Sequence, residues 1–87
     1  MLGAMAIPQT DNSSHSALCS ALGAAVKSKR AARGFTAQEF SLASGLSRSH
    51  LRAIEAGKGN PTLETIEKIA LALGEDPLEF LSDLSYS

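Results

Sequence analysis

The sequence is short of several residue types, and each shortage argues against a class of protein. One cysteine among 87 residues cannot form a disulfide within the chain, which favours a cytoplasmic protein over a secreted one. The absence of tryptophan and an aromatic content of 5% argue against a stacking platform for single-stranded nucleic acid. No apolar run approaches the roughly 20 residues of a membrane-spanning helix, and residues 1–7 lack the basic start of a signal peptide.

Residues suited to catalysis or metal binding are equally scarce. Of the two histidines, His15 falls in a polar segment near the amino terminus and His50 falls within an expected helix. The sequence has no nucleophile–base pair, no glycine-rich phosphate loop after a strand and no zinc-ligand spacing. We therefore expect no enzyme, no metal and no cofactor, and we interpret Cys19 as a half-buried small apolar residue.

The sequence does contain an uneven distribution of charge. The formal net charge is -1. Residues 27–58 hold seven basic and two acidic residues, a local charge of +5, whereas residues 59–87 hold one basic and six acidic residues, a local charge of -5. Such an asymmetry indicates either two faces with different partners or solvated helix surfaces without any.

Apolar spacing predicts an all-α fold of five short helices over residues 17–83, between a flexible arm over residues 1–16 and a tail over residues 84–87. The first helix, expected over residues 17–33, carries Leu18, Leu22 and Val26 at four-residue steps. Inward-facing residues expected on the later helices are Phe40, Ala43, Leu51, Ile54, Leu63, Ile66, Ile69, Ala70, Leu73, Leu78 and Leu81.

Capping residues mark the expected helix boundaries. Thr36 with Glu39, and Asp76 with Glu79, match the capping box, in which each side chain bonds the backbone N–H of the other residue. Ser47 is a favourable N-cap for the third helix. A glycine follows each of the first four expected helices, where a left-handed residue is favoured. The caps agree with the apolar spacing, which supports the all-helical prediction.

The second and third expected helices are joined by only three residues, 45–47, which predicts a helix-turn-helix over residues 36–56. Further segments follow in order: Val26-Lys-Ser-Lys-Arg30, Gly34-Phe-Thr36, Glu39-Phe40, Gly45-Leu-Ser47, Ile54-Glu55, Gly57-Lys58 and Asn60-Pro-Thr-Leu-Glu-Thr65. From about residue 22 to residue 81 the sequence resembles the Cro/cI-type (XRE family) helix-turn-helix domain of phage repressors and bacterial regulators. The resemblance implies a five-helix, lambda-repressor-like domain that binds double-stranded DNA, with the third helix (about 47–56) in the major groove.

Base contacts are expected on the third helix, on the side opposite its apolar residues. The expected residues are Arg48, Ser49, Arg52 and Ala53. Arg48 is the strongest of them, because a guanidinium pairs bidentately with guanine, worth roughly 1–3 kcal/mol of discrimination. Ser49 is less specific, Ala53 offers only a methyl group, and Arg52 could reach a base or a phosphate. His50 is expected at the margin of this face as a surface residue.

Phosphate contacts are expected from helix N-termini and from the loop after the third helix. The expected residues are Thr36, Gln38, Lys58, Asn60 and Thr62. The family usually has a glutamine directly after the N-cap of the second helix. Here Ala37 stands at that position, and Gln38 follows one step later, rotated by roughly 100°. Thr36 and Thr62 also act as N-caps, and Lys27 and Lys29 could face either DNA or solvent.

The resemblance further implies a structural ion pair between Arg30 and Glu55, so neither is expected to contact DNA. Removing one partner would cost on the order of 3–5 kcal/mol if the pair were fully buried. Dimerisation is expected on the fifth helix with part of the fourth. The expected interface residues are Leu78, Phe80, Leu81 and Leu84. The alternative is that these residues only close the core of the monomer.

These observations predict a sequence-specific double-stranded DNA-binding transcriptional regulator. We expect a homodimer in the cytoplasm, because one recognition helix reads only a few base pairs. The alternative is an antitoxin-like or other protein-interaction module whose main partner is another protein. Three roles stay open for the regulator fold: a phage-type repressor, a restriction–modification controller, which has the same single-domain format, and an antitoxin.

Overall fold

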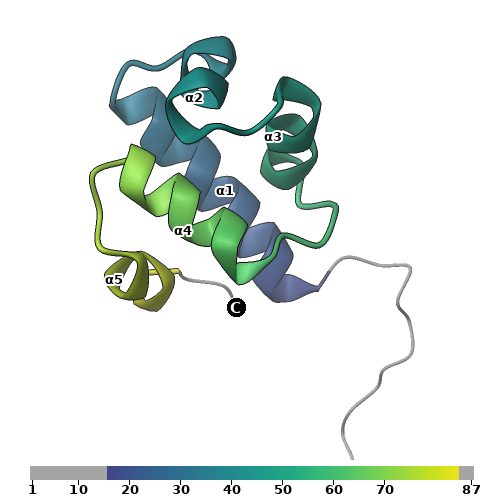
Figure 1. Ribbon diagram of the computed structural model, residues 1–87. Helices are drawn as coiled ribbons and strands as arrows, with labels where there is room; N and C mark the ends of the chain where they lie inside the picture. The colour runs from purple at the N-terminus through teal and green to yellow at the C-terminus, as the bar shows by residue number, and fades with distance from the viewer. Residues whose placement is uncertain (1–15, 85–87) are drawn as a thin grey trace, which may run out of the picture.

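The computed structural model describes residues 16–84, which form five α-helices and no strand (Figure 1). The helices are α1 (Ala17–Ala32), α2 (Ala37–Ser44), α3 (Arg48–Glu55), α4 (Leu63–Ala72) and α5 (Pro77–Ser82). The prediction of an all-α, five-helix fold is confirmed. The arm expected before α1 lies outside the described residues except for Ser16. Among the residues described, none of the helices is long and apolar enough to cross a membrane.

Each helix begins at a residue whose side chain accepts a hydrogen bond from a backbone N–H of its first turn. These N-caps are Ser16, Thr36, Ser47, Thr62 and Asp76. The capping box of α2 is complete, because Thr36 Oγ1 accepts from the Glu39 N–H and Glu39 Oε1 accepts from the Thr36 N–H. The second expected box forms in one direction only. The Asp76 carboxylate accepts from the N–H groups of Leu78 and Glu79, and in residues 16–84 the Glu79 side chain makes no bond in return.

The core is a single cluster to which all five helices contribute. Its buried apolar residues are Leu22, Val26, Phe40, Leu46, Leu51, Ile54, Ile69, Ala70, Leu73 and Phe80. Leu84, expected to begin the tail, is half-buried and packs against this cluster. The Phe35 and Phe40 rings, tilted by 59° with centroids 5.5 Å apart, extend the cluster toward the α1–α2 connection.

Four residues expected to face inward are exposed instead. Leu18, Leu63 and Leu78 lie in the first turns of α1, α4 and α5, where they are 49%, 77% and 76% exposed. Ala43 of α2 is exposed because Ser41 and Ser44 take the inward positions. Their hydroxyls donate to carbonyl oxygens of α2 itself, so the serines enter the core without leaving a polar atom unpaired.

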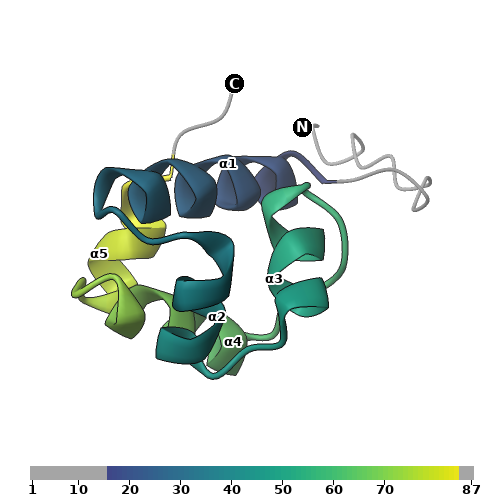
Figure 2. The same cartoon turned by 90° about the horizontal axis from the view of Figure 1, so that it is seen from above.

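The packing of the helices places α1, the longest of them, along one side of the molecule (Figure 2). α3 packs against α1, α2 packs against α3 and α4, and α5 packs against α4. Figure 2 shows α3 near the amino-terminal end of α1 and α5 near the other end. The helix-turn-helix and α5 are therefore presented from different parts of the same core.

Candidate nucleic-acid interface

A three-residue turn fixes α3 against α2. Gly45 adopts a left-handed conformation, with φ 79°, and its N–H donates to the carbonyl oxygen of Ser41. This conformation is one that glycine adopts without steric cost. Leu46 then packs into the core, and Ser47 caps α3 by accepting from the His50 N–H at 3.1 Å. The turn thus determines the direction in which α3 leaves α2.

The short α3 has one buried face and one exposed polar face. Leu51 and Ile54 are buried in the core, whereas Arg48, Ser49 and Arg52 are exposed. His50 is exposed as well. Within the described residues, no group of three or more His, Cys, Asp or Glu side chains is close enough to hold a metal ion. The exposed face is therefore that of a polar, positively charged helix.

Ala53 differs from the expectation of an exposed position. It is half-buried, and its Cβ lies 3.9 Å from the point where a Cβ on Gly59 would stand. The loop after α3 returns past this residue, because the Lys58 N–H donates to the Ala53 carbonyl oxygen at 2.9 Å. The methyl group of Ala53 is thus partly covered by the loop, and less of it is free for a base.

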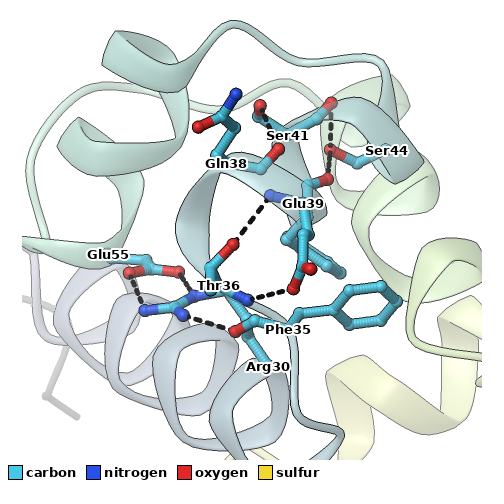
Figure 3. A network of polar contacts seen from close by, with 9 residues as sticks. Arg30, Phe35, Thr36, Gln38, Glu39, Ser41, Ser44 and Glu55 are labelled. Carbon is cyan, nitrogen blue, oxygen red and sulfur yellow. Dashed lines mark hydrogen bonds and ion pairs between the residues drawn. The ribbon is translucent and has the colours of Figure 1, made fainter.

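Arg30 and Glu55 form a bidentate ion pair that links α1 to α3 (Figure 3). Arg30 Nε donates to Glu55 Oε2 at 2.6 Å, and Nη2 donates to Oε1 at 3.0 Å. Nη1 donates to the Phe35 carbonyl oxygen at 2.8 Å. The two side chains are only 13% and 11% exposed. The hydrogen bonds to Glu55 raise the pKa of the Arg30 guanidinium, which therefore keeps its charge at any working pH.

The residues expected to contact phosphate are exposed but separate. Thr36 and Thr62 are N-caps of α2 and α4, and each hydroxyl already accepts a backbone N–H. Lys58 and Asn60 lie exposed in the loop between α3 and α4. The Gln38 side chain points away from the Arg30–Glu55 pair, and only its backbone carbonyl joins the network by accepting from Ser41.

Lys29 is partly exposed and forms an ion pair with Glu75. Its Nζ contacts both carboxylate oxygens of Glu75, at 3.0 and 3.1 Å, and lies 5.7 Å from the centroid of the Phe80 ring. Sequence reasoning missed this pair because 46 residues separate its members and no local spacing signals it.

The residues expected at a dimer interface divide into two groups. Phe80 is fully buried in the monomer core, so that assignment is wrong, and Leu84 packs against the same core. Leu78 is 76% exposed and Leu81 is half-buried. Both line an open groove between α4 and α5, together with Leu63, Ile66, Pro77 and two glutamates, Glu64 and Glu67. Leu63 and Ile66 were expected in the core, and their place in the groove was missed.

A family model described as "Helix-turn-helix" matches residues 26–80 of the chain. The chain belongs to this helix-turn-helix family. A curated relative, the "Uncharacterized HTH-type transcriptional regulator y4dJ" of Sinorhizobium fredii, is 36% identical over 53 residues, which are 61% of this chain and 69% of that protein. The family expected from the sequence is thereby confirmed.

Solved structures of two regulatory proteins agree with the fold. The restriction–modification controller protein C.AhdI from Aeromonas hydrophila is 32% identical, with a TM-score of 0.68 over 71% of this chain and 94% of that chain. The clp gene regulator ClgR from Corynebacterium glutamicum is 33% identical, with a TM-score of 0.71 over 79% of this chain and 73% of that chain. The similarity to both covers most of the described residues.

Proposed function

We propose that this helix-turn-helix protein is a transcriptional regulator that binds double-stranded DNA as a homodimer, with α3 in the major groove. The observation that carries the proposal is the exposed polar face of α3, where Arg48, Ser49 and Arg52 stand opposite the buried Leu51 and Ile54. The family match and the regulators of similar sequence and fold support it.

Arg48 is the principal base-reading residue of the proposal. It is the first residue of α3 and is exposed. The amino-terminal residues of a recognition helix are those that meet base edges. Its guanidinium can donate two hydrogen bonds to one guanine, and Ser49 adds a less selective contact. Arg52, one turn further along, is assigned to a base or a phosphate, and Ala53 contributes at most part of its methyl group.

Phosphates on either side of the groove are assigned to the ends of α2 and α4. Thr36 and Thr62 lie at helix N-termini, where free N–H groups and the helix dipole attract anions. Lys58 and Asn60 lie in the loop that leads to α4, and Gln38 lies in the first turn of α2. These contacts fix the position of the domain on the duplex, whereas α3 reads the bases.

The dimer is assigned to the groove between α4 and α5. Leu63 and Leu78 are 77% and 76% exposed there, and the half-buried Ile66 and Leu81 also line it. A second copy would cover these leucines, and two recognition helices would then reach half-sites about 34 Å apart. Leu78 and Leu81 thus keep the interface role expected from the sequence, and Phe80 does not.

Duplex binding at two salt concentrations tests the DNA assignment. We expect the chain to prefer a fragment from upstream of its own gene to random duplex, with an affinity that falls as salt rises. Arg48→Ala should lower the affinity for that fragment by roughly 5- to 150-fold, which corresponds to about 1–3 kcal/mol. Lys68→Ala, which removes the same charge from the exposed surface of α4, should leave it within twofold. Equal losses in both variants would reject the role of Arg48.

Analytical ultracentrifugation tests the dimer. We expect a dimer for the natural chain and a monomer for Leu78→Glu, because a carboxylate in an apolar interface loses its hydration. Leu42→Glu is a matched control, because Leu42 of α2 is equally exposed, at 76%, and lies outside the groove. A monomeric natural chain that binds no duplex at low salt would reject the proposal and favour the alternative, a module whose groove holds another protein.

A further inference from the structure

Gly23 stands in the middle of α1, where glycine is intrinsically unfavourable. A glycine in a helix interior is less stable than alanine because it has more backbone freedom to lose. The other glycines in residues 16–84 adopt positive φ angles, and Gly23 does not. Its backbone conformation therefore does not require glycine. The reason for a glycine here must be the space that a side chain would occupy.

That space is filled by the backbone of α3. A Cβ on Gly23 would overlap the carbonyl oxygen of Ile54 and would lie 2.9 Å from the Gly57 nitrogen and 3.0 Å from the Glu55 carbonyl oxygen. All three atoms belong to the main chain, so no side-chain rotation could make room. Gly57, just after α3, also lies close to the backbone of α1. A Cβ on Gly57 would lie 3.3 Å from Ser20 Cα.

The ion pair provides a second contact between the same two helices. Arg30 follows Gly23 by seven residues, two helical turns, and so lies on the same face of α1. It bonds Glu55, the last residue of α3, in a bidentate pair. Both contacts hold α3 at its carboxyl end. The amino-terminal end of α3 is joined to α2 by the turn over residues 45–47, and Arg48 and Ser49 are exposed there.

We infer that Gly23 is a positioning residue for base reading. The glycine allows the backbone of α1 to touch the carboxyl end of α3, and this contact together with the Arg30–Glu55 pair sets the angle at which Arg48 meets the bases. The inference rests on the proposed DNA-binding function. Because bidentate pairing with a base needs hydrogen bonds within a few tenths of an ångström of their ideal length, a small tilt of α3 disturbs base reading more than phosphate binding.

Gly23→Ala in the full chain tests the inference. The two probes are a duplex selected by the natural chain from a random-sequence library and a scrambled duplex of the same length. We expect at least a tenfold loss of affinity for the selected duplex and a change within twofold for the scrambled one. A purely structural role would lower both affinities together through the folded fraction. Ala24→Ser, which adds one atom at the adjacent exposed position of α1, should change neither.

The outcomes separate the inference from the proposed function. A folded Gly23→Ala variant with an unchanged ratio of the two affinities would overturn the inference alone. If that variant does not fold, Glu55→Asp tests the inference instead. It shortens the side chain that bonds Arg30 by one methylene and so weakens the second contact. It should then lower the ratio at least fivefold, and an unchanged ratio would overturn the inference. A natural chain that shows no preference for any duplex would overturn the proposed function, and the inference with it.

Discussion

The helix-turn-helix half and the α4–α5 half of this protein share one core and differ in what they expose. Residues 27–58 have a local charge of +5 and residues 59–87 one of -5. Among residues 16–84, the helix-turn-helix exposes one large apolar side chain, Leu42 of α2, and none on α3, whereas α4 and α5 expose Leu63, Leu71 and Leu78. A basic polar face suits a hydrated, charged duplex, and an apolar face suits another protein. The same core thus supports two surfaces of opposite chemistry.

The largest effect that we expect is a loss of stability within the α4–α5 half. Phe80 and Leu78 are two residues apart, yet the first is fully buried and the second is 76% exposed. Phe80→Ala should cost about 3–5 kcal/mol, because it leaves a cavity between α1, α4 and α5. A chain of this size has a total stability of about 5 kcal/mol, so the variant should be largely unfolded. Urea denaturation at low protein concentration measures the loss.

Leu78→Ala is the matched control for this experiment. It should change the stability of the monomer by less than about 0.5 kcal/mol, because the side chain loses few contacts there. Similar losses in the two variants would mean that α5 closes the core through both residues. The exposed apolar residues of α5 would then belong to the monomer core. The claim that the α4–α5 half presents an apolar surface to a partner would be wrong.

The second test concerns the pair that ties α3 to α1. Glu55→Ala leaves Arg30 with only the Phe35 carbonyl, and we expect a loss of about 3 kcal/mol, the lower end for a buried pair, since both side chains keep some exposure. Because the folded pKa of Arg30 is raised, its contribution is complete below the unfolded pKa and disappears only as the pH rises through the folded value. The loss should therefore be constant between neutral pH and pH 9.

Urea denaturation of Glu55→Ala measures this loss, and Glu67→Ala is the control. Glu67 is exposed on α4 and should contribute little to the stability of the monomer. A loss below about 1 kcal/mol in Glu55→Ala would place the pair among ordinary surface ion pairs. Apolar packing would then contribute most of the stability between α1 and α3.

Most of the fold could be predicted because its signals are local. Thr36 and Glu39 are three residues apart and form the capping box that their spacing predicts. The buried face of α3 also followed from the spacing of Leu51 and Ile54. The inward serines of α2 could not be predicted in this way. Apolar spacing favours Ala43, and only the observed bonds explain why a hydroxyl can replace it in the core.

The candidate site was predicted less completely because it depends on contacts between distant segments. Exposure of Arg48 followed from helical geometry, but the covering of Ala53 depends on the return of the loop at Gly59. The sequence left two places open for Phe80, in the core or at an interface. The core position is decided by the packing of α5 on α4, to which periodicity within a six-residue helix gives no guide.

The smallest expected effect belongs to the ion pair that joins α1 to the connection between α4 and α5. Lys29 and Glu75 are 31% and 22% exposed, so water screens much of their attraction. A double-mutant cycle with Lys29→Met and Glu75→Gln should give a coupling of less than about 1 kcal/mol, and it should shrink at high salt. A coupling above about 2 kcal/mol would mean that this charge pair, rather than the shared core, holds the two halves together. The substitutions would then be expected to change the orientation of α5 relative to α1, and with it dimerisation, although they lie outside the groove.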